Sequence, residues 1–250
     1  MEGKTEPGTV PINQASVEQW RSIHEDADIL VVDKLAPLPV QAEKSGDAAL
    51  QDLLRAMLVA RGGEAGTDVA AAAFLEAAHR IDRRASGAVI FAKTHRSLET
   101  LEADFREHRI GKRYVACVEK EPTSASGSLV NRLAWDKRKN IVRVLAPGAV
   151  ASESQEAKLS WKLVARSERY FFLEVELETG RHHQIRAQLA AAGLPIRGDV
   201  KYGAKRTTKN GLIMLHSWQL VLTQPKTRET LTLLAPFPET EPLWRAFTGS

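Results

Sequence analysis

The segment His79-Arg80-Ile81-Asp82-Arg83-Arg84-Ala85-Ser86-Gly87 sets one aspartate among three arginines, directly before an apolar run. Guanidinium groups close to a carboxylate favour its ionised form, and an ionised carboxylate in a fixed position can act as a nucleophile or as a base. The same residues can also be a solvated charge cluster in front of a strand. The spacing within this segment does not decide between the two interpretations.

The apolar runs on both sides of this segment predict a sheet. Gly87–Ala92 and Ile29–Val32 are apolar throughout, which is typical of buried strands. Leu173, Val175 and Leu177 alternate with glutamates, as in a strand with one solvated face. β-Branched and aromatic residues predict further strands at 113–118, 141–145, 159–165, 171–177, 214–222 and 230–234. This pattern predicts an α+β fold, with a large mixed, mostly antiparallel sheet and flanking helices and loops.

Three helices are predicted. Residues 47–60 carry an apolar stripe, with Asp47 as an N-terminal cap and Gly62-Gly63 as the end. Residues 94–108 form a second amphipathic helix, and residues 181–192 form a third that ends at Gly193. Residues 122–128 and 147–156 are expected to be polar loops, and residues 1–27 a loosely packed N-terminal leader.

A second charged segment, Glu178–Arg186, lies where a strand is expected to lead into the third helix. The free N–H groups of a helix N-terminus make a natural anion site. On a helix, His182 and Arg186 would share a face, and Gln184 would point elsewhere. Adjacent histidines on a helix diverge and no cysteine is close in the sequence, so His182 and His183 are not expected to bind a metal.

Composition limits the class of protein. The chain has 250 residues and a net charge of +4, which permits nucleic-acid binding without requiring it. Its one cysteine, Cys117, cannot form an internal disulfide, which favours a reducing compartment, hence the cytoplasm. We find neither a signal peptide pattern nor an apolar run near the roughly 20 residues of a membrane span. Three basic clusters, at 106–113, 137–143 and 197–209, can line a phosphate-binding groove or be solvated surface.

Several motifs together resemble those of the RluA-type RNA pseudouridine synthases. His79–Gly87 resembles the HRLDxxTSG signature of that family, Arg181–Arg186 its GRxHQIR motif, and Lys112-Arg113-Tyr114 its KxY segment. Further similarities are found at Ile29–Lys34 (ILVVNKP), Gly198–Gly203 (GDxxYG) and Leu215-His216-Ser217 (LHA or LHS). The motifs follow the family's order across about residues 29–237. Each motif alone is weak, but together they are specific.

The resemblance implies a reaction and roles for residues. The reaction is the isomerisation of uridine to pseudouridine within RNA, with Asp82 as the essential carboxylate. Tyr114 would stack on the target uracil near C5, and Arg186 would pair with Asp82. Arg80 would help to push the base out of its stack, and the other substrate-binding residues would be Arg181, His183, Gln184 and Tyr202.

The sequence departs from the family pattern at three places. Ile81 replaces a leucine, Ala85 stands where threonine is common, and Leu35 stands where proline is usual. None of these departures touches the implied catalytic residues, although the missing hydroxyl at residue 85 can change how the loop is held. Residues 28–250 are expected to form one catalytic domain, with no S4-type RNA-binding domain before it.

The expected partner is ribosomal or transfer RNA, with no DNA and no membrane, and the expected state is a monomer. The isomerisation is redox-neutral, so no cofactor is expected. Two alternatives remain: an RNA-binding module that has lost catalysis, and a metal-dependent hydrolase using His182, His183 and Asp199.

Overall fold

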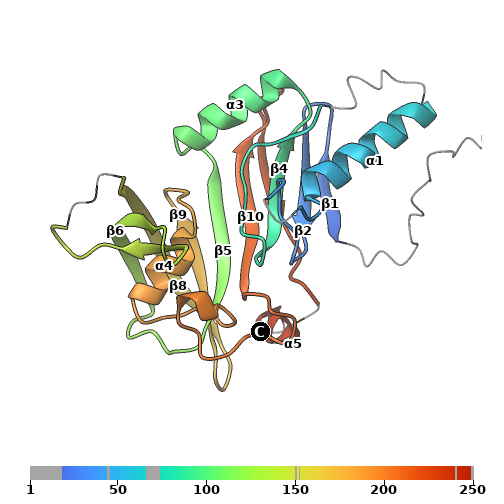
Figure 1. Ribbon diagram of the computed structural model, residues 1–250. Coiled ribbons are helices and arrows are strands. Elements are labelled where there is room, and N and C mark those ends of the chain that lie inside the picture. The colour runs from blue at the N-terminus through green and yellow to red at the C-terminus, as the bar shows by residue number, and fades with distance from the viewer. Residues whose placement is uncertain are drawn as a thin grey trace, which may run out of the picture.

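The computed structural model describes residues 19–43, 46–65, 74–149, 151, 153–239 and 241–248. The strands of this part of the chain form one 11-stranded sheet in the order β1-β2-β4-β10-β5-β9-β8-β6-β7, with β3 paired to β4 and β11 paired to β10. Figure 1 shows the long sheet, with α1 beside the β1–β2 half and α4 beside the β6, β8 and β9 half. The elements are β1 (Trp20–Glu25), β2 (Ile29–Lys34), α1 (Leu50–Ala65), β3 (Glu76–Ala77), β4 (Ser86–Ala92), α3 (His95–Arg106), β5 (Gly111–Val118), β6 (Ser126–Asp136), β7 (Ile141–Val144), β8 (Gln155–Arg166), β9 (Phe171–Leu177), α4 (Gln184–Ala191), the 3₁₀ turn η1 (Val200–Tyr202), β10 (Leu215–Thr223), β11 (Thr230–Leu234) and α5 (Pro242–Thr248).

The predicted α+β class and the mostly antiparallel sheet are confirmed. Among the strand pairs that the structure describes, β4 and β10 run parallel, and the others are antiparallel. The parallel pair lies at the centre of the sheet, next to β5. Two chain segments that are distant in sequence, the β3–β4 loop and β5, are thereby brought to the same region.

The sheet is buried on both faces around β2 and β4, which explains their continuous apolar runs. Leu30 and Val32 of β2 belong to the core on one face, where α1 packs through a stripe that includes Leu54. Ile29 and Val31 belong to the core on the other face, where α3 contributes Leu101. Thr94 caps α3 by accepting from the backbone N–H of Ser97, so this helix begins where the sequence predicts.

Four predicted boundaries are wrong. Strand β6 begins at Ser126, inside the predicted loop 122–128. The sequence pattern did not predict this strand, because few of its side chains are buried and it therefore has little apolar periodicity. Helix α1 begins at Leu50 and runs through Gly62-Gly63 to Ala65, since a glycine costs a helix only about 1 kcal/mol. The third helix begins at Gln184 rather than at residue 181. The predicted leader contains strand β1, which pairs with β2 at the edge of the sheet. The rest of that leader, residues 1–18, lies outside the described residues.

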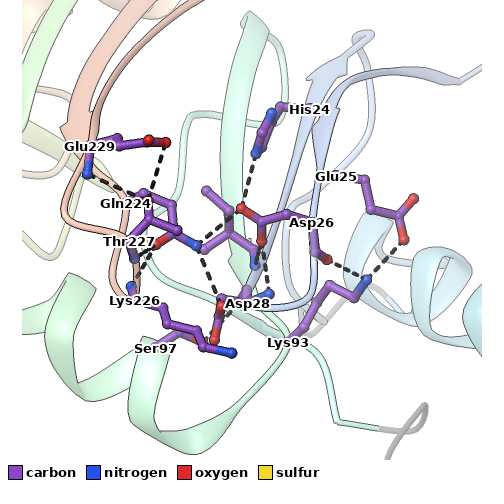
Figure 2. A network of polar contacts seen from close by, with 11 residues as sticks. His24, Glu25, Asp26, Asp28, Lys93, Ser97, Gln224, Lys226, Thr227 and Glu229 are labelled. Carbon is purple, nitrogen blue, oxygen red and sulfur yellow. Dashed lines mark hydrogen bonds and ion pairs between the residues drawn. The ribbon is translucent and has the colours of Figure 1, made fainter.

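A polar network holds three turns together at one end of the sheet (Figure 2). Asp26 accepts from the backbone N–H groups of Asp28 and Ile29, which shapes the β1–β2 turn. Gln224, after β10, donates to Asp26 at 3.1 Å, and Lys93, before α3, donates to the Asp26 carbonyl at 2.7 Å. The network joins the β1–β2 turn to the chain after β4 and to the turn after β10, and so fixes these strand ends relative to one another.

No helix in the described ranges is long and apolar enough to cross a membrane.

Candidate active site

The loop that carries Asp82 joins β3 to β4, and a buried lysine fixes its backbone. Lys34 at the end of β2 donates from Nζ to the carbonyl of Ala85 at 2.6 Å and to that of Arg83 at 3.3 Å. Burial lowers the pKa of Lys34 to about 7, and the negative charge of Asp82 opposes that decrease. At the start of β4, two residues after Ala85, Gly87 has φ +114°. A Cβ at this position would stand 2.3 Å from the carbonyl oxygen of Ser217 on β10. Only glycine therefore allows β4 to approach β10 here.

Arg186 connects Asp82 to a second carboxylate. Its Nη1 donates to Oδ2 of Asp82 at 3.0 Å. Its Nε and Nη2 donate to the two carboxylate oxygens of Asp199 at 2.6 and 2.8 Å, which is a bidentate pair. Burial opposes the charged form of Arg186, but the hydrogen bonds that it donates to Asp199 and the negative charge of Asp82 raise its pKa above the usual value. The guanidinium is thus permanently charged and held on both sides.

Asp199 was not predicted for this position. The sequence suggested it only as a ligand in the metal-hydrolase alternative. The structure buries Asp199 almost completely and turns both of its oxygens to Arg186. The GDxxYG resemblance could have indicated a role, since it marks a charged residue between two glycines.

His183 lies beside Asp82 in a conformation that few residues other than glycine adopt. Its φ is 50°, and it caps α4 from the left-handed region. Nε2 of His183 lies 3.7 Å from Oδ1 of Asp82, and Nδ1 lies 2.8 Å from the hydroxyl of Tyr202. That hydroxyl accepts from the N–H of Val142, so it is free to donate to Nδ1, which places the imidazole hydrogen on Nε2 facing Asp82. Burial lowers the pKa of His183 to about 3, so the ring is neutral.

Tyr114 on β5 contributes a buried ring with a protonated hydroxyl. Burial raises the pKa of Tyr114 to about 12, and the charge of Asp82 acts in the same direction. Tyr114, Asp82 and Arg186 line one small pocket. The structure therefore brings together the three residues that the motifs single out as catalytic, although Asp82 and Arg186 are separated by 104 positions in the chain.

Four of the five predicted substrate-binding residues line the pocket, and the fifth, Tyr202, lies behind it. The pocket that holds Asp82 is also lined by Arg80, Arg181, His183 and Gln184. The prediction that Gln184 points away from the site is wrong, because Gln184 is the first residue of α4 and lines the pocket. Its Oε1 accepts from the N–H of Arg181, and its Nε2 donates to the carbonyl of Lys158, so it stabilises the turn before the helix. Tyr202 is not among the lining residues. Its ring lies against the Arg186 guanidinium at 4.8 Å, so it supports the site from behind.

Two further hollows open beside the pocket, and Arg181 lines all three. One of them contains Trp135 of β6, whose ring lies 5.2 Å from that of His182. Trp135 is 41% exposed, so its ring is accessible from solvent in this hollow. Sequence reasoning missed Trp135, because strand β6 was not predicted.

The histidine pair differs from the sequence-based expectation. His182 and His183 precede α4 instead of lying on it, and their rings stack at 3.9 Å rather than diverging. With Asp82 they form a group whose ligand atoms lie within 4.8 Å of one another. Arg186 already occupies Asp82 with a positive charge, which disfavours a cation there, and Asp199 faces Arg186 instead of the histidines. This arrangement does not fit the metal-hydrolase alternative.

Comparisons with known proteins agree with this geometry. The family model described as RNA pseudouridylate synthase matches residues 28–191. The ribosomal large subunit pseudouridine synthase C of Vibrio vulnificus is 30% identical over 245 residues, which cover 94% of this chain and 72% of that protein. The uncharacterised RNA pseudouridine synthase YhcT of Bacillus subtilis is 29% identical, covering 86% of this chain and 68% of that protein. The solved structure of human RNA pseudouridylate synthase domain containing 4 shares the fold, with a TM-score of 0.70 at 21% identity over 87% of this chain and 88% of that one.

The chain belongs to the RNA pseudouridylate synthase family. Within it, the chain is of the RluA type, as its motifs and these relatives indicate. It is therefore an isomerase that converts uridine in RNA to pseudouridine.

Proposed function

We propose that Asp82 is the catalytic carboxylate of this isomerase and that its targets are specific uridines of ribosomal RNA, transfer RNA or both. The observation that carries the proposal is the hydrogen bond of 3.0 Å from Arg186 to Oδ2 of Asp82, made at the wall of a pocket that Tyr114 also lines. Arg186 holds one oxygen of the carboxylate, and the other oxygen, Oδ1, is left to react. Two relatives, from Vibrio vulnificus and Pasteurella multocida, are both named ribosomal large subunit pseudouridine synthase C, which favours ribosomal RNA as the target.

The target uridine must leave its stack before Asp82 can reach it, because C1′ and C5 are inaccessible inside a helix. Flipping costs a few kcal/mol. In this proposal Arg80, at the exposed edge of the pocket, takes the place of the base in the stack. Stacking on Tyr114 returns about 1–3 kcal/mol. The flipped nucleotide is thereby held with its sugar facing Asp82.

The chemistry then exchanges one bond for another. Asp82 either attacks the ribose or removes a ribose proton, the N-glycosidic bond breaks, and the uracil turns so that C5 bonds to C1′. As C5 bonds to C1′, the bond from Asp82 to the ribose breaks, or Asp82 returns the ribose proton. Tyr114 keeps the detached base stacked, and its hydroxyl passes its own proton to solvent as it accepts the C5 proton, while N1 of the uracil takes up a proton from solvent. His183 is neutral, and its Nε2 lies 3.7 Å from Oδ1, so it forms the polar wall beside the reacting oxygen without holding it by a hydrogen bond. No cofactor is required, because the sum of these steps is an isomerisation.

The remaining expectations complete the proposal. Arg181, His183 and Gln184 line the pocket and belong to its substrate-binding wall, and Tyr202 supports that wall. Residues 28–250 act as one catalytic domain, and the enzyme works as a cytoplasmic monomer on RNA, without a metal.

Release of tritium from RNA labelled at uridine C5 tests the proposal. The RNA is total RNA from cells that lack the gene, so that its target sites are unmodified. We expect the wild-type protein to release tritium and Asp82→Ala to release none. Equal release by both would refute the role of Asp82, and no release by either would favour the non-catalytic RNA-binding module. Chemical mapping of pseudouridines in the same RNA before and after treatment identifies the target.

A further inference from the structure

Lys112 at the start of β5 is buried, and no acidic side chain of the described residues pairs with it. Only 6% of the residue is exposed. Among the residues that the structure describes, its ammonium has no hydrogen bond and no ion pair, and its aromatic neighbour is the Phe105 ring, with Nζ 5.8 Å from the ring centroid. Burying a charge is unfavourable unless the charge is paired. A bound anion would supply the missing partner of the Lys112 ammonium.

The hollow around Lys112 is strongly basic. Arg80, Arg106 and Arg181 line it, together with His79 and His108, and its described lining contains no aspartate or glutamate. His79 adds no charge, because burial lowers its pKa to about 3. Of the three arginines, Arg80 has an ion pair with an acid outside the hollow, Glu43 at 3.3 Å. The hollow as a whole therefore has an excess of positive charge that an anion would balance.

The ammonium of Lys112 lies next to the pocket that holds Asp82. A Cβ built on Gly180 would stand 3.5 Å from Lys112 Nζ, which places the ammonium against the backbone just before Arg181. Burial lowers the pKa of Lys112, and the charge of Arg181, which lines the same hollow, lowers it further. The hollow and the pocket share Arg80, Tyr114, Leu177 and Arg181.

If a nucleotide has its base in the pocket, its sugar and phosphate lie outside the pocket, where the shared lining of pocket and hollow can contact them. We propose that Lys112 and Arg181 together bind a phosphodiester group of the RNA strand adjacent to the uridine that is isomerised, with Arg106 at the outer edge of the same site. This inference rests on the proposed function in one respect, since it takes the pocket at Asp82 as the place where the uridine binds. The ligand is a backbone phosphate, so the site binds RNA irrespective of base sequence.

The salt dependence of RNA binding tests the site. Lys112→Met keeps the apolar stem over Phe105 and removes the charge. Lys120→Met is the matched control, because Lys120 is exposed just beyond the opposite end of β5. All variants are made in an Asp82→Asn background, so that binding is read without turnover. Filter binding of total RNA from cells lacking the gene is measured over a range of potassium chloride concentrations.

We expect Lys112→Met to bind about tenfold more weakly at low salt and to reduce the slope of log affinity against log salt by about 0.7–0.9, the value for one phosphate contact. Lys120→Met should keep the slope of the parent. An unchanged slope in Lys112→Met would overturn the proposal. Arg106→Gln, on an exposed side chain that leaves the fold intact, should reduce the slope in the same direction, and an unchanged slope there would also count against the site.

Inorganic phosphate provides a second readout in the active enzyme. At matched ionic strength it should inhibit tritium release competitively with RNA, and Lys112→Met should need about tenfold more phosphate for the same inhibition. Equal inhibition of both proteins would contradict a phosphate site at Lys112. If Asp82→Ala were to retain turnover, the catalytic assignment would fail while the slopes would still report on Lys112, so the two failures are distinguishable.

Discussion

Asp199→Asn tests whether Arg186 must be held from behind in order to serve Asp82. Asp199 is 1% exposed and accepts from Arg186 at 2.6 and 2.8 Å. An asparagine keeps the shape but removes the charge and turns an N–H toward the guanidinium. Losing a charged hydrogen bond costs about 1.5–3 kcal/mol, and truncating one partner of a buried ion pair costs about 3–5 kcal/mol. Because Asp82 remains as a second partner, we expect a loss of about 2–4 kcal/mol in the free energy of unfolding.

The activity of Asp199→Asn should decrease as well. Arg186 would be held by Asp82 alone, and a displacement of about 1 Å in such a site costs about 100-fold in rate. Urea denaturation at constant m-value measures the stability, and single-turnover tritium release measures the rate.

Asp104→Asn is the matched control, because Asp104 is also buried and paired with an arginine, Arg109 at 2.7 Å, but lies on α3 away from the pocket. It should lose stability and keep its rate. A rate for Asp199→Asn within twofold of wild type would show that Asp199 does not position Arg186 for the reaction.

Three further changes give distinct results. Tyr114→Phe keeps the stacking ring but lacks the hydroxyl, so RNA affinity should stay within about threefold while the single-turnover rate decreases about 100-fold. Trp135→Ala removes an exposed ring 5.2 Å from His182, and should raise the KM for RNA about tenfold at unchanged kcat if that ring stacks on a base next to the target. Asp33→Asn should stabilise the protein by about 2–4 kcal/mol at pH 8 and by little at pH 4, as followed by urea denaturation. Burial raises the pKa of Asp33 to about 7, and neither of its oxygens accepts a hydrogen bond among the described residues. The wild-type protein therefore loses stability as the pH rises from about 4 to about 7, and the variant does not.

Each of these expectations has an outcome that contradicts it. Full-speed turnover by Tyr114→Phe would remove the hydroxyl from the mechanism. Val164→Ala, at another exposed apolar side chain, is the control for Trp135→Ala, and equal KM values for the two variants would assign Trp135 no contact with RNA. If the free energies of unfolding of Asp33→Asn and wild type differ by the same amount at pH 4 and pH 8, then Asp33 does not ionise between these two pH values in the folded protein.

The sequence predicts those parts of the fold in which burial and local pattern agree. Strands β2 and β4 are apolar because both of their faces are covered, and α3 has both a capping threonine and an amphipathic stripe. Strand β6 was missed because its stability comes from pairing with β7 and β8, which no local apolar pattern reports.

In the candidate site, too, residues within sequence motifs were predicted and residues whose position depends on tertiary contacts were not. Asp82, Tyr114 and Arg186 were found through motifs. Residues that act through tertiary contacts, such as Asp199 behind Arg186 and Trp135 beside His182, were not. The start of α4 was misplaced because His183 adopts a left-handed conformation that its position beside Asp82 and Tyr202 maintains, against its local preference.

In the proposed mechanism the carboxylate of Asp82 performs the isomerisation, while the cations around it bind the RNA. The most direct measurement compares Asp82→Asn with wild type in two assays on the same C5-tritiated RNA: single-turnover tritium release and filter binding. We predict no detectable release by the variant and an RNA affinity within about threefold of wild type, since the phosphate contacts come from lysine and arginine side chains. Release at a rate close to wild type would show that Asp82 is not the catalytic carboxylate, and a loss of binding as large as the loss of turnover would show that Asp82 itself binds the RNA.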